Sequence, residues 1–592
     1  MRTSRHTAPT LLALSLALAL AACSSKQEGT THPIKTDEST KPAANQAATL
    51  RLQDAGSPHS ADAMLSLKEE PPASPVAGGS HHRAEKKVMK AKALASGVVA
   101  EAVAVAPEDG NRERYGKVTD HPIKQVSEAP VSTFSIDVDT GSYANVRRLL
   151  NSGQLPPKDA VRVEEMINYF PYSYPSQANG RPFAVHTEVA PSPWSRTTHL
   201  LKIGIKAQEL AKAELPPANL VFLVDVSGSM NEPNKLPLLQ QSLKLLVKQL
   251  RPQDKVSLVI YASGTGVILP PTSGSDPGRI LAAIDQLKPG GSTAGEAGIR
   301  LAYQMAHRSF VKGGINRILL ATDGDFNVGI ADTNQLKEMV ETERRGGVSL
   351  STLGFGTNNY NEALMEQIAD VGNGNYSYID TLNEGRKVLV DEMTSTLATV
   401  AKDVKIQVEF NPAAVSEYRL IGYENRQLQR EDFNNDKIDA GEIGAGHTVT
   451  ALYEITLKGQ PTQVDPLRYG TQPKNEGGKP EELAFLRLRY KAPDGDTSKL
   501  METPLHQRDI LPSFDQASTD LRFAAAVAGF GQRLRGGLHT ANLDYAAIKQ
   551  LAQSALGDDR WGYRGEFMQL VDQARSLDRP NKPGMQSAQI SR

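Results

Sequence analysis

The chain has 592 residues, more than one hydrophobic core supports, so two or three domains are expected. Apolar residues make up 39% and charged residues 22%, which is typical of a folded protein and excludes a wholly disordered one. Lys and Arg total 66 against 67 Asp and Glu, so no basic excess is available to bind a phosphate backbone, and nucleic acid is excluded as a partner.

Residues 1–22 have the pattern of an export signal. Two arginines precede an apolar run, Leu11 to Ala22, that is too short to span a bilayer. The only cysteine, Cys23, follows Leu20-Ala21-Ala22, and this junction resembles the lipobox of bacterial lipoproteins. The resemblance implies that Cys23 is acylated and that several acyl chains anchor the protein to a membrane. The alternative is ordinary secretory cleavage, since Ala19-Leu20-Ala21 has the A-x-A pattern.

The residue after the cysteine bears on the destination of the protein. Lipoproteins without an acidic residue there usually reach the outer membrane, and here the residue is Ser24. The resemblance therefore implies a cell envelope lipoprotein of the outer membrane that faces the periplasm, with the inner membrane as the alternative. Residues 23–130 are rich in Ala, Ser, Pro, Lys and Glu without periodicity, which predicts a disordered tether.

Residues 131–215 read as a mixed segment of strands and helices. Strands are expected at Phe134–Val138, Phe183–Val189 and Leu200–Lys206, and short helices at Ser142–Leu150 and Asp159–Phe170. The stretch Asp137-Val-Asp-Thr140 is similar to the D-x-D-x-T loop of haloacid-dehalogenase-type phosphatases, but its threonine comes one position early. A turn that caps the following helix is the preferred interpretation.

Residues 216–400 alternate strands with helices. Leu220–Val224 is a continuous apolar run, as expected for a strand buried on both faces, and further strands are expected at 256–261, 318–322 and 348–355. Long helical patterns separate them, the last at Leu382–Leu397. This alternation predicts an α/β fold with a doubly wound, mainly parallel sheet.

After residue 400 the hydrophobic period returns to two. Val404, Ile406, Val408 and Phe410 alternate with polar residues, which indicates half-buried antiparallel strands over 401–512. Similar strands precede the α/β region, so we expect the α/β domain to be inserted into a β-sandwich made from both flanks. Residues 513–580 have the pattern of a helical C-terminal segment.

Five oxygen-bearing residues follow strand ends of the predicted parallel sheet. Asp225, Ser227 and Ser229 leave the first strand, Thr293 lies in a Gly-rich loop, and Asp323 ends a later strand. Open α/β sheets bind ligands outside the carboxyl ends of their strands. Two carboxylates and three hydroxyls favour a hard cation, Mg²⁺ or Mn²⁺, with water completing its shell. The structural alternative is that Ser227 and Ser229 only cap the next helix and that Asp225 stabilises a turn.

This constellation resembles the metal-ion-dependent adhesion site of the von Willebrand factor A family. The resemblance implies that Ser227, Ser229 and Thr293 bind the metal through their hydroxyls, and that Asp225 and Asp323 bind it directly or through water. In that family an acidic residue of a partner protein takes the open coordination position. A change of this ligand shifts the last helix of such adhesion domains, so we expect occupancy to reorient the α/β domain against the sandwich. The alternative is a rigid joint.

Three further stretches are similar to bacterial von Willebrand A lipoproteins of the YfbK type. They are Phe134–Tyr143, Thr322–Gly329 and Trp561–Phe567, and the resemblance covers roughly residues 132–577. The expected function is envelope-anchored, metal-dependent protein binding and not catalysis, since no general acid, base or nucleophile is assembled beside the metal. The alternatives are a metal-dependent phosphohydrolase, which a Lys or Arg near the cation together with Asp325 would favour, and a structural envelope scaffold.

Overall fold

The computed structural model describes residues 113–176, 180–292, 295–324, 333–357, 360–465, 467–468, 479–540 and 542–578. All of them belong to one unit, which begins at residue 102. The expected signal peptide, the lipidation site Cys23 and the tether up to residue 112 lie outside the described residues. In the part of the chain that is described, no helix combines the length and apolarity needed to cross a membrane.

The α/β domain is built on a six-stranded sheet with the order β10-β9-β8-β5-β6-β7. Its strands are β5 (Ala218–Asp225), β6 (Lys255–Tyr261), β7 (Thr265–Ser273), β8 (Ile315–Thr322), β9 (Ser349–Gly354) and β10 (Tyr376–Tyr378). All neighbours pair in parallel except β7, which pairs antiparallel with β6 at one edge. Every residue of β5 is buried, as its apolar sequence requires for a central strand covered on both faces.

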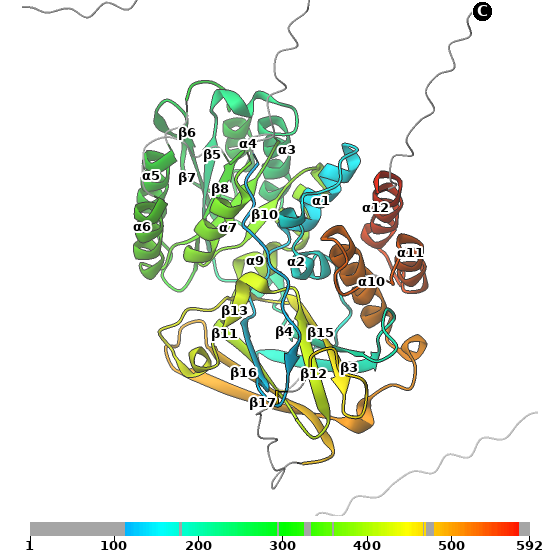
Figure 1. The fold of residues 1–592 in the computed structure, drawn as a ribbon. Helices are drawn as coiled ribbons and strands as arrows, with labels where there is room; N and C mark the ends of the chain where they lie inside the picture. Colours follow the sequence, from blue (N-terminus) through cyan, green and yellow to red (C-terminus); the bar gives the residue numbers. More distant parts are fainter. Residues whose placement is uncertain are drawn as a thin grey trace, which may run out of the picture. The chain divides into compact units, whose positions relative to one another are not determined.

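Helices pack on both faces of this sheet, and Figure 1 shows α5 and α6 on the side opposite α3 and α4. One face contacts α3 (Leu236–Val247), α4 (Pro277–Asp285) and the last helical segment of the domain. The other face contacts α5 (Gly295–Arg308), α6 (Thr333–Arg345) and α7 (Glu362–Val371). The predicted doubly wound, mainly parallel sheet is therefore confirmed.

The last helical segment differs from the prediction of one continuous helix. It consists of α8 (Leu382–Arg386), a π-helical turn (Lys387–Asp391) and α9 (Met393–Leu397). Strand β11 begins at Thr399, so only Ala398 separates the segment from the following sheet. π-Helical turns are rare and occur often at functional sites. The link to the sandwich is shorter than the sequence indicates.

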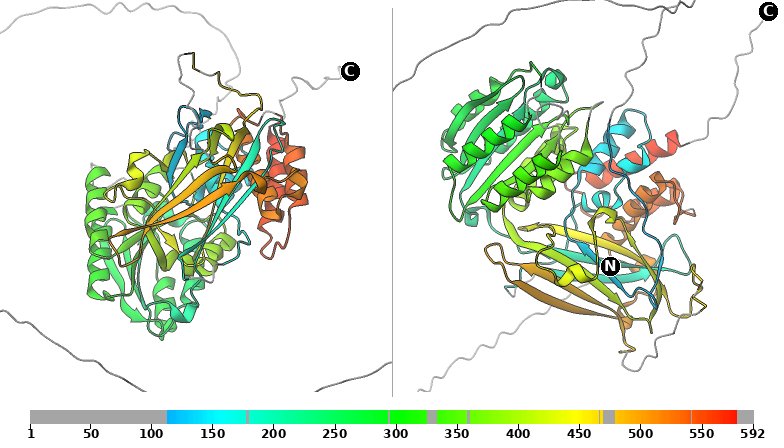
Figure 2. Two further views of the ribbon diagram at one scale, coloured as in Figure 1. Left: turned by 90° about the horizontal axis from the view of Figure 1, so that it is seen from below. Right: turned by 60° about the vertical axis from the view of Figure 1, so that its left-hand side comes forward.

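Strands from both flanks of the α/β domain form two further sheets. One has the order β1-β12-β15-β4-β3, with β1 (Lys124–Gln125), β12 (Val415–Ile421), β15 (Thr448–Leu457), β4 (His199–Ala207) and β3 (Phe183–Pro191). The other has the order β13-β2-β11-β16-β17, with β13 (Gln427–Leu428), β2 (Val131–Ser135), β11 (Thr399–Phe410), β16 (Glu482–Lys491) and β17 (Ser498–His506), and β14 (Ile443–Gly444) pairs with β11. Buried side chains of both sheets share one core, and Figure 2 shows the sheets stacked. The inserted α/β domain in a β-sandwich is thus confirmed.

The N-terminal and C-terminal helices share a separate core. It joins α1 (Gly141–Asn151) and α2 (Val163–Asn168) to α10 (Thr519–Leu534), α11 (Tyr545–Ser554) and α12 (Tyr563–Leu577). Aromatic rings at its centre contact edge to face, for example Phe170 with Phe523 at a centroid distance of 4.8 Å. The helical C-terminal segment was predicted, whereas its packing against α1 and α2 was not.

Residues 113–130, which the sequence analysis assigns to the tether, belong to the folded unit. The Arg114 backbone N–H donates to the Tyr360 carbonyl at 2.9 Å, and Lys124 lies opposite Tyr418 in the β1–β12 pair. Asp120 forms an ion pair with Arg535 at 2.6 Å. Long-range contacts of this kind leave no periodic pattern in the local sequence, which therefore did not indicate that the stretch is folded.

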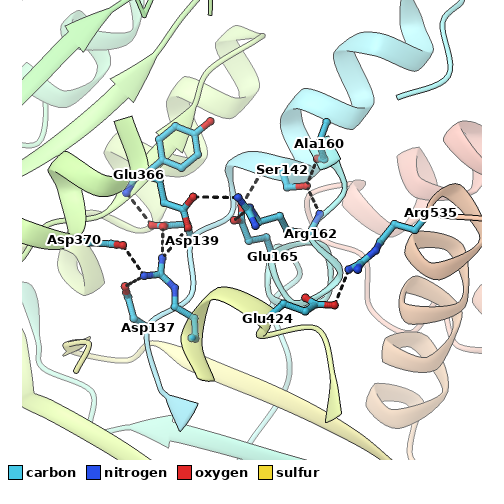
Figure 3. A network of polar contacts seen from close by, with 12 residues as sticks. Asp137, Asp139, Ser142, Ala160, Arg162, Glu165, Glu366, Asp370, Glu424 and Arg535 are labelled. Carbon is cyan, nitrogen blue, oxygen red and sulfur yellow. Dashed lines mark hydrogen bonds and ion pairs between the residues drawn. The ribbon is translucent and has the colours of Figure 1, made fainter. Parts of the chain in front are cut away.

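Asp137 and Asp139 form a polar joint between the sandwich and the α/β domain (Figure 3). Both carboxylates pair with Arg426, at 3.1 and 3.0 Å, and the same guanidinium pairs with Asp370 of α7 at 2.7 Å. The helix-capping interpretation of this stretch is wrong, because Thr140 precedes α1 without a side-chain capping bond. Burial raises the pKa of Asp370 to about 6, so this joint contains an acid that titrates near neutral pH.

Candidate functional site

The two predicted carboxylates lie at the same edge of the parallel sheet. Asp225 is the last residue of β5, and Asp323 follows Thr322, the last residue of β8. Because β5 and β8 pair in parallel, with Val224 opposite Ala321, their carboxyl ends meet at one edge. Both aspartates are fully buried, at 0% exposure. Two acids in one buried site need positive charge nearby, which a cation would supply.

Hydrogen bonds orient the Asp225 carboxylate. Its Oδ1 accepts from the Ser227 backbone N–H at 2.9 Å, and its Oδ2 accepts from the Thr322 hydroxyl at 2.9 Å and the Tyr261 hydroxyl at 3.3 Å. Burial raises the pKa of Asp225 to about 6, and the charge of nearby Asp323 adds to the rise against these hydrogen bonds. The carboxylate is held in one orientation and gains from a positive charge beside it.

The two serines lie together beyond the end of β5. The Oγ atoms of Ser227 and Ser229 are 3.0 Å apart. Ser227 precedes a short 3₁₀ turn, Gly228–Asn231, without a side-chain capping bond, and the residue before α3 is Lys235. The serines therefore do not cap α3, which contradicts that part of the structural alternative, whereas the bond from the Ser227 N–H to Asp225 does stabilise the turn. Their hydroxyls are placed as a pair instead.

The Gly-rich loop that precedes α5 lies beside the turn that carries the two serines. Gly228 donates its backbone N–H to the Gly291 carbonyl at 2.9 Å, and Gly290 donates to the Val226 carbonyl at 2.7 Å. These bonds tie the two loops side by side. Thr293, the fifth predicted ligand, lies two residues further on and outside the described residues.

A lysine that the sequence analysis did not single out lies against Asp323. The Nζ atom of Lys235 is 3.2 Å from Asp323 Oδ2, and the lysine is 3% exposed. Lys235 is 88 residues from Asp323 in the chain, so no local pattern could indicate the pair. It supplies the basic residue that the phosphohydrolase alternative requires, whereas Asp325, the second requirement, lies outside the described residues.

The donor set fits a hard cation only if hydroxyls take part. Among the described residues, no group of three His, Cys, Asp or Glu side chains is placed to hold a metal ion. Two carboxylates with the serine pair and a threonine instead give an all-oxygen set of the kind that Mg²⁺ and Mn²⁺ accept. The orienting bonds on Asp225 and the buried charge of Asp323 are consistent with this use.

Comparisons with known proteins identify the domains of the chain. The family model described as von Willebrand factor type A domain matches residues 219–391, one described as von Willebrand factor matches residues 109–202, and one described as the C-terminal part of uncharacterized protein YfbK matches residues 395–577. The chain is 55% identical over 469 residues to uncharacterized protein YfbK of Escherichia coli (strain K12), covering 78% of this chain and 81% of that protein.

More distant similarity reaches other organisms. The chain is 23% identical over 262 residues to inter-alpha-trypsin inhibitor heavy chain H3 of Mesocricetus auratus, covering 41% of this chain and 29% of that protein. A solved structure described as von Willebrand factor type A from Catenulispora acidiphila aligns at a TM-score of 0.37 and 16% identity, covering 66% of this chain and 90% of that chain. None of these descriptions names a catalytic activity.

Proposed function

The chain belongs to the YfbK family and carries a von Willebrand factor A domain, and from this premise we propose that it is an envelope-anchored, metal-dependent protein-binding module. Domains of this type commonly mediate contacts between proteins. The proposed partner is a protein that offers an acidic side chain to the metal. The proposed role is recognition or assembly, without catalysis.

The observation that carries this proposal is the pair of buried carboxylates beside two hydroxyls at one sheet edge. Mg²⁺ or Mn²⁺ would be held by Asp225, Ser227, Ser229, Thr293 and Asp323. When bound, the ion would offer an open coordination position to a carboxylate of the partner. Hydrogen bonds from the Thr322 and Tyr261 hydroxyls orient Asp225 toward this use.

Anchoring is a second part of the proposal. The lipobox-like junction at Cys23 supports an acylated N-terminus, and Ser24 supports the outer membrane with the folded part facing the periplasm. About 90 residues separate Cys23 from Glu113, where the described chain begins. A flexible chain of that length has a root-mean-square span of about 50 Å, so the binding site can act away from the membrane.

Lys235 is the one observation that favours the phosphohydrolase alternative. It forms an ion pair with Asp323 at 3.2 Å. Hydrolysis of a phosphate monoester such as p-nitrophenyl phosphate, dependent on both Mg²⁺ and Lys235, would support that alternative. A scaffold role would instead show itself as loss of folding when the metal is removed.

The test of the proposed function is capture of partners from an envelope extract by the immobilised folded part, with Mg²⁺ or with chelator. We expect proteins that are retained with Mg²⁺, released by chelator, and lost with Asp323→Ala. The matched control is Asp572→Ala, which removes a half-exposed carboxylate on α12. A retained set that is the same in all four conditions would show that the candidate site does not bind them.

A further inference from the structure

Lys235 is buried where a cation is expected. It directly precedes α3, and its Nζ atom lies 3.2 Å from Asp323 Oδ2 and 3.6 Å from Oε1 of the half-exposed Glu232. A lysine is almost never this buried unless its charge is paired. Its ammonium group therefore pairs with Asp323, the same carboxylate that would bind the metal in the proposed site.

The backbone is shaped to admit this side chain. Gly356 follows β9 with a φ of +79°, and a Cβ atom at that position would lie 2.2 Å from Lys235 Cε and 2.6 Å from its Cγ. The Gly356 carbonyl also accepts a hydrogen bond from the buried Tyr378 hydroxyl, which fixes the loop. A side chain at position 356 would collide with the Lys235 side chain, so glycine at this position makes room for the buried lysine.

The charges of the site determine what this lysine does. Among the described residues, ionised Asp225 and Asp323 together with Lys235 give the metal-free site one net negative charge. A divalent cation changes this to one net positive charge, and a single carboxylate of a ligand then makes the site neutral. Without the lysine, the two aspartates alone would neutralise the divalent ion, and an added carboxylate would leave an excess negative charge. Charge imbalance in a buried site is strongly unfavourable.

We propose that Lys235 is a built-in cation that sets the ligand requirement of this site. In the metal-free protein it neutralises Asp323 and stabilises the fold. In the metal-loaded protein it opposes the ion and makes an anionic ligand necessary for charge balance. The inference rests on the proposed function, because it assumes that Asp225 and Asp323 bind the metal, and it adds a reason why the ligand carries a carboxylate.

The experiment compares Lys235→Met with wild type in chelator and in saturating Mg²⁺, using thermal unfolding and isothermal titration with MgCl₂. We expect Lys235→Met to unfold at a lower temperature than wild type in chelator and to recover to at least the wild-type temperature in Mg²⁺. We expect it to bind Mg²⁺ at least tenfold more tightly. Lys244→Met is the matched control, since it removes a partly exposed lysine on the same helix and leaves both quantities unchanged.

A carboxylate probe tests the ligand requirement. Acetate, compared with chloride at equal ionic strength, should tighten Mg²⁺ binding to wild type and should do so less, or not at all, in Lys235→Met. If Lys235→Met does not fold in chelator, Lys235→Gln serves in its place, since its amide keeps a donor to Asp323 without the charge.

The outcomes separate the two proposals. If the lysine variants are destabilised equally with and without Mg²⁺ and bind it no more tightly than wild type, Lys235 is only structural and the inference is overturned. In that case Mg²⁺ binding by wild type, abolished by Asp225→Ala, would leave the proposed function intact. If wild type itself binds no Mg²⁺, the proposed function fails and the inference with it.

Discussion

Replacing Arg147 by methionine should destabilise the folded unit strongly. Arg147 of α1 is 3% exposed, and its guanidinium pairs with Asp380 and, at 2.8 Å, with Glu384 of α8. It also donates to the Tyr169 hydroxyl at 2.9 Å and reaches Glu566 of α12 at 3.3 Å. One side chain thus joins the last helical segment of the α/β domain to the helices of both termini.

The magnitude follows from what methionine would leave behind. Asp380 and Glu384 have side chains only 5% and 1% exposed, so both would lose their cation inside the protein. Removing one partner of a buried ion pair typically costs about 3–5 kcal/mol. Glu566 is 35% exposed and should add little, because water screens its charge. We expect a loss of about 4 kcal/mol, or a fall in Tm of roughly 4 °C for a unit of this size.

Thermal unfolding followed by circular dichroism at pH 7.5 is the assay. The double variant Arg147→Met/Glu384→Gln should recover at least about 1 kcal/mol relative to Arg147→Met, because one of the unpaired charges is gone. A loss below about 1 kcal/mol for Arg147→Met, or no recovery in the double variant, would refute the reasoning that Arg147 holds these helices together.

Three further outcomes are expected. In chelator, Asp225→Asn should unfold at a higher temperature than wild type at pH 7.5 and at the same temperature near pH 4. The reason is that a pKa raised from 3.8 to about 6 removes roughly 3 kcal/mol of wild-type stability as pH rises through that range. Equal Tm differences at both pH values would contradict this. Cys23→Ser should release the protein from the membrane fraction. An unmodified N-terminus in wild type, shown by mass spectrometry, would contradict the proposed lipid anchor. A disulfide engineered to pin α8 to α3, against which it packs, should alter retention of partners; equal retention by the oxidised and reduced forms would show a rigid joint.

The sequence predicted those parts of the fold whose hydrophobic pattern is local. The unbroken apolar run of β5 indicated a buried parallel strand, and the alternation in β11 indicated an antiparallel one, and both are present. The prediction that β11 is half-buried is wrong, because Lys405 and Gln407 on its polar face are 0% and 4% exposed. Edge strand β7 was missed because Pro270 and Pro271 interrupt its pattern, which an edge strand tolerates but a periodicity analysis does not. The π-helical turn at Lys387–Asp391 leaves the apolar spacing nearly unchanged and gave no signal.

The candidate site shows the same limit. Asp225, Ser227 and Ser229 were recognisable because three oxygens stand at alternate positions in one short turn. Lys235 carries as much charge beside the site, yet it resembles any lysine that precedes a helix. Its role depends on Asp323, 88 residues away, and on the absence of a side chain at Gly356. Contacts of this kind arise only when the sheet brings the strand ends together.

Isothermal titration of Mg²⁺ into the folded part tests the central claim most directly. Wild type should bind one ion, and Asp225→Ala and Asp323→Ala should each weaken binding at least tenfold, about 1.4 kcal/mol, while circular dichroism shows the fold unchanged. Ser227→Ala and Thr293→Ala should weaken it less, because a cation gains most from the carboxylate charges. Unchanged Mg²⁺ affinity in a folded Asp225→Ala variant would contradict the assignment of this sheet edge as a metal site.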